Sequence, residues 1–547
     1  MYPSKFLRLY FASTAKARLT ETQVSKLRNV PGILQVVPET VSHLHTTRTP
    51  DFLQLSQSFG LWPKSDYGND MIIGVLDSGI WPESESFKMM AGSVVKNAGF
   101  YGLARGDARG MATKARLAIY KVCWEYGSKI SCSDADILAA LEDAISDGVN
   151  VISMSIGTFA AVKKGITVSC SAGNDGPRES TVENLAPWIL TVGASSIDRD
   201  FRADAILGDG PGGPADPHLL PATMVDPMAG NIIRSYANQS SAKARIIFKG
   251  TVIGGNPLIP APQVAQFSSR GSNRVTPGIL KPDFMAPGVN ILASWTGVNS
   301  PSGLSFDTRR QVKFNIKYGT SMACPHVSGL AALLHKVYPN WSPAAIKSAL
   351  MTTAYNVDNT GNGIRDLATG NPSTPFDHGS GHVDPNRALD PGLVYDLGVN
   401  DYIGFLCSIG YNERQIEQIV QDQTVDCSTM GLASPGDLNY PSFSIVFKAS
   451  NNKITIKRVL KNVGQSENVV YDVKVSSPSF IETTVLPSKL VFSPENHSLS
   501  YEVTFSALVD LKEGTFPQFG WIEWTDGHHN VRSPIAFARG MDLLSSI

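Results

Sequence analysis

The chain is short of charge, of cysteine and of long apolar runs, and each shortage excludes a class of protein. Only 17% of its 547 residues are charged, and 47 Lys and Arg against 48 Asp and Glu give a net charge of −1. That balance offers no electrostatic basis for binding nucleic acid or a membrane surface. No apolar run approaches the roughly 20 residues of a membrane span. What remains is a globular protein long enough for two or three domains.

Six cysteines are too few to build a disulfide scaffold, but four of them are close in sequence. The two pairs are Cys123 with Cys132 and Cys407 with Cys427. Either pair could bridge in an oxidising compartment. The other two, Cys170 and Cys324, lie in apolar segments, where we expect buried thiols.

Two further features bear on the compartment. Asn238 and Asn496 begin N-x-[ST] sequons and are the glycosylation candidates. The opening stretch MYPSKFLRLYF has no adequate apolar region or cleavage site, so we identify no signal peptide in it. These residues therefore leave the compartment open.

From about residue 70 to residue 194, apolar strands alternate with helices. The run MIIGVLDSGI predicts a strand that ends at Asp77, and SDADILAALEDAISDG (133–148) predicts an amphipathic helix. Near-continuous apolar strands that alternate with helices indicate a parallel α/β sheet. Since chemistry gathers at the carboxyl ends of such strands, Asp77 and Asn174 are candidates for a site there.

After about Leu438 the pattern changes to short runs of alternating apolar and polar residues. Examples are KITIKRVL, NVVYDVKV and SYEVTFSAL. A series of such runs predicts a separate C-terminal β-sandwich.

The stretch YGTSMACPHVSGLAALLHKVYP places a serine at the start of a predicted helix. Val327, Leu330 and Leu334 recur at helical spacing. Pro325 suits the first turn, where its missing N–H costs little. Ser321 then lies where free backbone N–H groups favour negative charge. One interpretation is a helix N-cap; the other is a nucleophile, which needs a base and an acid that orients the base.

Six motifs occur in the order found in one enzyme family. They are IIGVLDSGIWPESESF, VISMSIG, SCSAGNDGP, FSSRGSN, KPDFMAPGVNILASW and GTSMACPHVSG. The ordered set resembles the subtilases, in particular the plant subtilisin-like serine proteases of the cucumisin-like type. HGSGHVDPNRALDPGLVYD and LNYPSFSI extend the resemblance toward the C-terminus. It implies a three-layer α/β subtilisin-like domain with a mainly parallel sheet, followed by a fibronectin-III-like β-sandwich.

The resemblance assigns three catalytic roles. Ser321 would attack the scissile carbonyl of a protein or peptide, Asp77 would orient the base, and Asn174 would donate to the oxyanion. Taken alone, the D-S-G and N-D-G sequences at Asp77 and Asn174 are also turn signals. The reaction would pass through an acyl-enzyme, and no cofactor is expected.

The resemblance also assigns a substrate-binding strand. The segment SMSIG resembles an edge strand that pairs with an extended peptide. Ser153, Ser155 and Gly157 would then bind the substrate backbone.

The base is missing from its expected place. The family's histidine lies in an H-G-T-H element after the Asp motif, but residues 78–114 contain no histidine. His326, in the helix of Ser321, resembles a buried family histidine that is not the base. His43 and His45 fall in a segment that resembles the end of a propeptide. The alternative to an endopeptidase is therefore an inactive pseudoprotease or a peptide-binding remnant.

His378 and His382 alternate with Asp377 and Asp384, a pattern that superficially suggests a metal site. The family shows this loop without an assigned metal. We therefore expect an ordered Gly-rich loop and no metal.

The resemblance also implies a domain order with internal deletions, of which the missing His segment is one. The parts are a partial inhibitory propeptide (1–45), the first part of the catalytic domain (46–202), a remnant of a protease-associated insertion (203–262), the second catalytic part (263–430) and the sandwich (437–547). The resemblance implies secretion to the extracellular space or apoplast. It also implies that, in the full-length family form, the protein's own propeptide is its inhibitor.

Overall fold

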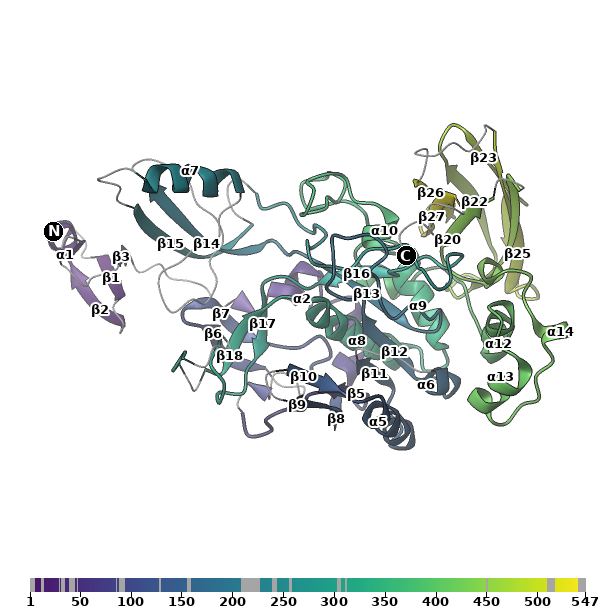
Figure 1. Cartoon of the computed structure of the whole chain (residues 1–547), viewed down its shortest axis with the longest axis horizontal. Helices are drawn as coiled ribbons and strands as arrows, with labels where there is room; N and C mark the ends of the chain where they lie inside the picture. Colours follow the sequence, from purple (N-terminus) through teal and green to yellow (C-terminus); the bar gives the residue numbers. More distant parts are fainter. Residues whose placement is uncertain are drawn as a thin grey trace.

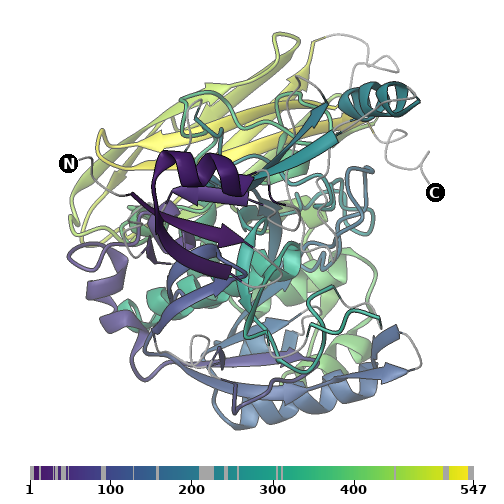
Figure 2. The same cartoon turned by 90° about the vertical axis from the view of Figure 1, so that its left-hand side faces the viewer.

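The fold is taken from a computed structural model. It describes residues 5–10, 14–28, 30, 35–38, 45–46, 48–84, 86–87, 94–126, 129–154, 159–207, 227–238, 244–254, 258–302, 306–309, 312–448, 451–508 and 517–539. The central sheet lies in the middle of the molecule, and the C-terminal sandwich lies to the right in Figure 1. Figure 2 gives the view from the left-hand side, with the N-terminal strands toward the viewer.

A six-stranded sheet forms the centre of the first domain. Its order is β16 (Phe284–Pro287), β13 (Leu190–Ser195), β12 (Thr167–Ser171), β11 (Val151–Met154), β5 (Ile72–Asp77) and β8 (Arg116–Lys121). All five neighbouring pairs are parallel. The predicted parallel α/β sheet is therefore confirmed, and the carboxyl ends of its strands share one edge.

Helices cover both faces of this sheet. The long helix α8 (Thr320–Val337) packs across five of its strands. Leu117 faces a cavity beside α8, whereas the Tyr120 hydroxyl donates to Asp147, directly after α5 (Asp134–Ser146), at 2.7 Å. Because strand side chains alternate, α8 and α5 lie on opposite faces. The result is the expected three-layer arrangement.

The remaining helices and short strands of this domain are smaller. The helices are α2 (Arg48–Phe52), α3 (Leu61–Lys64), α6 (Phe159–Lys163), α9 (Pro343–Thr352), α10 (Pro375–His378), α11 (Pro385–Ala388), α12 (Val399–Ser408), α13 (Glu413–Val420) and α14 (Cys427–Met430). The 3-10 helices within the described ranges are η1 (Asp66–Gly68) and η2 (Pro435–Asp437). Short antiparallel pairs join β9 (Cys123–Tyr126) with β10 (Lys129–Cys132) and β17 (Ile291–Ser294) with β18 (Phe314–Lys317).

The start of α8 differs from the prediction. The helix begins at Thr320, and Gly319, with φ of 150°, is the N-cap residue. Ser321 is therefore the second residue of the helix and not its cap. Pro325 consequently falls in the second turn, one turn later than the sequence predicts.

The described residues of the connection between β5 and β8 include a hairpin. It consists of β6 (Val95–Phe100) and β7 (Leu103–Ala108), and β7 also pairs with β4 (His45–Thr46). The face of β5 and β8 next to α8 borders a cavity, described below.

Two small units lie outside the central sheet. The N-terminal unit has a sheet of β2 (Thr14–Leu19), β1 (Lys5–Tyr10) and β3 (Gln35–Pro38) with helix α1 (Glu21–Arg28). The other has β14 (Arg199–Leu207) antiparallel to β15 (Ala244–Ile253), with α7 (Pro227–Ala237). The first unit lies in the segment predicted as a propeptide part (1–45). The second overlaps the predicted insertion remnant (203–262), although β14 begins at Arg199, within the predicted first part of the catalytic domain.

The C-terminal part is a two-sheet sandwich, as predicted. One sheet has the order β19 (Leu393–Val394), β21 (Lys453–Asn462), β25 (Ser498–Ala507), β23 (Ile481–Leu486). The other has β20 (Phe443–Phe447), β27 (Asn530–Arg539), β26 (Gln518–Thr525), β22 (Val469–Ser476), β24 (Lys489–Phe492). Aromatic residues such as Tyr501, Phe505 and Trp524 fill the core between them.

Two disulfides lie in the first domain. Cys407 joins Cys427 and ties α12 to α14, while Cys123 joins Cys132 across β9 and β10. The remaining cysteines, Cys170 and Cys324, are buried free thiols. None of the helices in the described ranges has the length and apolarity needed to cross a bilayer.

Candidate active site

Ser321 lies in the first turn of α8, with its side chain at the surface. Backbone N–H groups at this end of a helix have no intrahelical acceptor, and the helix dipole favours negative charge there. The tight approach of Gly319 to Gly288 presents the turn to the edge of the sheet, since the Gly319 N–H donates to the Gly288 carbonyl at 2.9 Å. Negative charge that develops beside Ser321 would therefore be stabilised.

Asn174 lies in the turn that follows β12, and it contacts the residue before Ser321. Its side-chain oxygen accepts hydrogen bonds from the Thr320 N–H at 2.9 Å and from the Thr320 hydroxyl at 3.0 Å. Because the oxygen accepts both of these bonds, the amide N–H groups are the part of the Asn174 side chain that can donate. Sequence reasoning missed Thr320, although its place directly before Ser321 was a usable signal.

Asp77 is the last residue of β5, at the same edge of the sheet, and its side chain is exposed. Its Oδ1 accepts the Ser78 N–H at 2.6 Å. This local bond agrees with the interpretation of D-S-G as a turn. It occupies only one of the two carboxylate oxygens. The other oxygen remains able to orient a partner.

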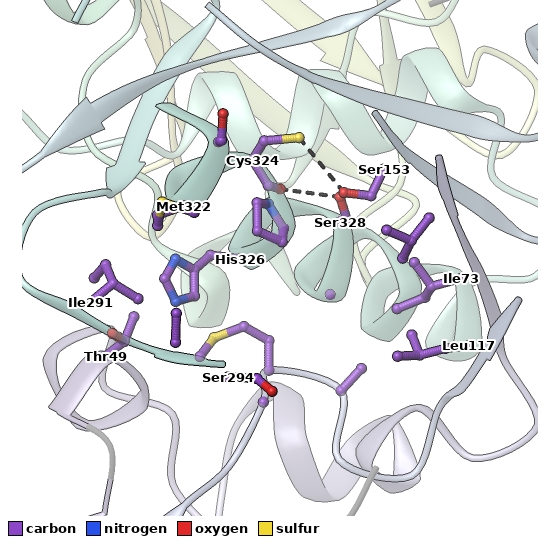
Figure 3. Close-up of a pocket in the computed structure, with 18 of the residues that line it drawn as sticks. Thr49, Ile73, Leu117, Ser153, Ile291, Ser294, Met322, Cys324, His326 and Ser328 are labelled. Carbon is purple, nitrogen blue, oxygen red and sulfur yellow. Dashed lines mark hydrogen bonds between the residues drawn. The ribbon is translucent and has the colours of Figure 1, made fainter. Parts of the chain in front are cut away.

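Asp77 and Ser321 line the same cavity, which has a volume of ≈ 350 Å³. Ile73 and Leu117 lie on one side of it, and Ile291 and Met322 on the other (Figure 3). Asp77 and Ser321 thus line one cavity, and Asn174 contacts Thr320, the neighbour of Ser321. A largely apolar cavity with a few polar groups is typical of a ligand site.

The segment expected to pair with the substrate, which begins at Ser153 in β11, agrees less well with the structure. Ser153 pairs with Val75 of β5 on one side and with Ser169 of β12 on the other. β11 is therefore a central strand at this point, and the Ser153 backbone has no free edge for a peptide. This part of the expectation is corrected for Ser153, while Ser155 and Gly157 lie outside the described residues.

No imidazole described by the structure bridges Asp77 and Ser321. His326 lines the cavity, but its Nδ1 donates to the Pro287 carbonyl at 2.9 Å (Figure 3). Burial lowers the pKa of His326 to about 4, so the ring is neutral at pH 7. Among the residues that the structure describes, the cavity therefore has a carboxylate and a serine hydroxyl but no imidazole between them.

Cys324, one turn beyond Ser321, is not a rival nucleophile. Its Sγ lies 3.8 Å from the Ser153 Oγ and 3.4 Å from the Ser169 Oγ. Burial raises the pKa of this thiol, which keeps it protonated and poorly nucleophilic. Cys324 is thus a packed residue in the wall of the cavity (Figure 3).

The other predicted positions either hold the local structure together or lie exposed at the surface. Asp377 and Asp384 cap short helices, accepting the N–H groups of Thr374 and of Asn386 respectively. His378 bonds to Ser373 at 2.9 Å, and His382 packs against the Phe52 and Tyr355 rings. This describes an ordered loop. Asn238 and Asn496 are both exposed, as glycosylation requires.

Comparisons with known proteins agree with this geometry. A profile of the subtilase family matches residues 88–381, a range that contains Asn174 and Ser321 and begins after Asp77. A fibronectin type-III domain profile matches residues 437–537.

Similar proteins are found in Arabidopsis thaliana. Subtilisin-like protease SBT1.4 is 43% identical, over 97% of this chain and 89% of its own length. Subtilisin-like protease SBT1.7 is 40% identical, over 95% of this chain and 89% of its own length. The alignment with the first spans 702 positions, so at least 155 of them have no residue in this chain of 547. That difference agrees with internal deletions.

Proposed function

Because the chain belongs to the subtilase family, we propose that the cavity is a serine endopeptidase site whose general base this chain does not supply. The observation that carries the proposal is the arrangement of Asn174, Thr320 and Ser321 at the start of α8. It provides a nucleophile and an oxyanion donor, and Asp77 lines the same cavity.

The chemistry follows from these positions. The Ser321 Oγ would attack the peptide carbonyl, forming a C–O bond as the Oγ proton leaves to a base. The Asn174 amide and the N–H groups of the first helical turn would stabilise the oxyanion, a contribution typically worth about 2.7–4 kcal/mol. The C–N bond then breaks, the amine takes the proton, and water releases the acyl group.

The lack of a general base limits the rate of this reaction. Asp77 can orient an imidazole, but residues 78–114 contain none. In subtilisin, loss of the histidine alone lowers kcat by about 10⁶, and the oxyanion hole and substrate binding provide the remainder. We therefore expect this chain to be almost inert, and a chain with an H-G-T-H segment restored near residue 90 to be an endopeptidase.

The experiment compares the two forms in a peptide-anilide assay. The restored chain should turn over substrate, and Ser321→Ala in that chain should abolish the activity. Turnover by the unrestored chain that Ser321→Ala abolishes would mean that another group is the base, with His326 the first candidate.

A second candidate function is peptide binding without turnover. The open cavity beside Ser321 and the missing base favour it. A fluorophosphonate separates the two: labelling of Ser321 indicates residual nucleophilicity, and binding of a peptide without labelling indicates a pseudoprotease.

We also propose an oxidising, extracellular location such as the apoplast. The support is two disulfides, which persist in oxidising compartments, and two exposed sequons. In the same scheme residues 1–45 are part of an inhibitory propeptide. Retention of the α1 and β1–β3 unit after secretion would contradict this assignment.

A further inference from the structure

A cluster of two histidines and one aspartate lies where the two domains meet. Asp390 follows α11 in the first domain, and His528 and His529 lie in the turn between β26 and β27 of the sandwich. The potential ligand atoms of the three residues lie within 4.8 Å of one another. The cluster is far in sequence from the cavity of Ser321 and plays no part in the proposed reaction.

The turn fixes His529 in one orientation. Asp526 accepts the backbone N–H groups of His528 at 2.8 Å and of His529 at 2.6 Å. Its second oxygen accepts the Nδ1–H of His529 at 2.8 Å. The proton of a neutral His529 ring is therefore on Nδ1, and a lone pair is on Nε2. Carboxylates bonded in this way to the far nitrogen are common behind metal-bound histidines.

His529 Nε2 faces a carboxylate. Nε2 is buried and lies 3.3 Å from the Asp390 Oδ1. At this separation the two atoms need a positive charge between them, which is either a proton on Nε2 or a metal ion. Ligand atoms on a tetrahedral zinc, with bonds of about 2.0 Å, are separated by about 3.3 Å. The observed spacing is that of two such ligands.

Close packing around Gly392 fixes the first domain against the sandwich at this point. Gly392, two residues after Asp390, has φ of 73°, and a Cβ there would lie 2.8 Å from the His529 Cγ. The Gly392 carbonyl also accepts the N–H groups of Val463 and Gly464 at 3.0 and 3.1 Å. The segment that carries Asp390 is therefore fixed against the His529 turn.

We propose that Asp390, His528 and His529 form a site for a divalent transition-metal ion that clamps the first domain to the sandwich. Two imidazoles and a carboxylate suit Zn²⁺, and a water molecule would complete the tetrahedron on the exposed side of the cluster, beside His528. His528 is exposed, so its ring can rotate toward the ion at little cost. The site provides an inter-domain link and carries no catalytic step.

The test uses the full chain without an affinity tag, treated with a chelator and then titrated with ZnCl₂ by calorimetry. We expect one equivalent to bind, the melting temperature to rise, and the chelator to reverse that rise. His528→Ala should lower the affinity at least tenfold. Asp526→Asn keeps all three ligands but loosens His529, and should lower the affinity 10–100-fold. His497→Ala, at another exposed sandwich histidine, is the matched control and should bind as the parent chain does.

Cobalt provides a check that does not depend on stability. Co²⁺ in the site should give a visible absorption band of tetrahedral intensity, and His528→Ala should remove it. His528→Gln serves as a second variant if His528→Ala fails to fold. The proposal is overturned if the parent chain shows no saturable zinc binding, or if both His528 variants bind zinc as tightly as the parent. No saturable binding would leave a proton, and not a metal, between His529 and Asp390. Unchanged binding in both variants would mean that the zinc is held by other residues.

Discussion

The side-chain oxygen of Asn174 accepts two hydrogen bonds from Thr320, one from its N–H and one from its hydroxyl. Thr320 is buried and is the first residue of α8, so a helix end fixes a side chain from the turn after β12. The Asn174 amide group is thus oriented before any substrate binds. Such preorganisation makes an oxyanion donor effective, because little reorganisation is needed during the reaction.

This arrangement predicts the effect of removing the Asn174 amide. In the chain with a restored H-G-T-H segment, Asn174→Ala should lower kcat by about 10²–10³ and change KM little, since the donor acts on the transition state. Peptide-anilide kinetics measures both constants. Asn468→Ala, at an exposed position on the sandwich outside any sequon, is the control and should leave them unchanged. An unchanged kcat in Asn174→Ala would exclude this residue as the oxyanion donor.

Acid should destabilise the fold through buried neutral histidines. Burial lowers the pKa of His335 and His326 to about 4, and of His378 and His382 to about 3, from an unfolded value of about 6.5. The unfolded chain then binds more protons between these values. The stabilisation is fully present above pH 6.5 and is lost as the pH falls through about 4 for His335 and His326, and through about 3 for His378 and His382. The slope is up to about 1.4 kcal/mol per pH unit for each ring.

His335→Asn isolates one of these rings. His335 bonds to the Thr167 hydroxyl at 2.9 Å, and asparagine is polar but does not titrate. Urea unfolding at pH 7, 6 and 5 should show a slope against pH smaller by up to one proton. His497→Asn, at an exposed position, is the control for any general effect. Equal slopes in the parent and in His335→Asn would show that this ring is already charged in the folded state.

The buried ion pair of Lys281 and Asp283 should be costly to break. Both side chains are inaccessible, and Nζ lies 2.8 Å from Oδ2. Lys281→Met leaves the carboxylate buried without its counter-ion, and should destabilise the protein by about 3–5 kcal/mol. Adding Asp283→Asn should recover part of that loss. Lys489→Met removes a 2.8 Å pair with Asp472 that is exposed, and should cost less than about 1 kcal/mol. Similar losses from both Lys variants would contradict this account.

The Cys407–Cys427 disulfide should stabilise the end of the first domain. It closes a loop of 20 residues, and loops of this size are typically worth about 3 kcal/mol. The double variant Cys407→Ala, Cys427→Ala should therefore melt at a lower temperature than the parent. A reductant should lower the melting temperature of the parent more than that of the double variant, in which only Cys123–Cys132 remains. Equal sensitivity to reductant would place the effect in the other disulfide.

Local pattern was enough to predict much of the fold. The strand that ends at Asp77 and the helix that carries Val327, Leu330 and Leu334 are where the apolar spacing places them. Strands buried on both faces and helices with one buried stripe have clear signatures. The sandwich could also be predicted from local pattern, because its strands alternate buried and exposed residues.

Pairings between distant residues could not be predicted. Ser153 was expected at a free edge, because the sequence does not say that β5 and β12 flank it at that residue. The role of Thr320 depends on a side chain 146 positions away. Asp390 and His529 come together only when the first domain and the sandwich meet, and nothing local marks either residue as a ligand.

The two-residue strand β19 joins the two domains through main-chain pairing, and this pairing limits where their coding sequences can be recombined. Leu393 and Val394 pair with Asn462 and Lys461 of β21, and the next residue, Tyr395, donates or accepts a 2.6 Å hydrogen bond with the Tyr501 hydroxyl. During synthesis β19 leaves the ribosome well before β21, so the earlier domain presents an edge onto which the later sheet assembles. A recombination event at residue 437, where the sandwich profile begins, would separate these partners. Exchange of the C-terminal module between relatives is therefore expected to succeed only at junctions before residue 393.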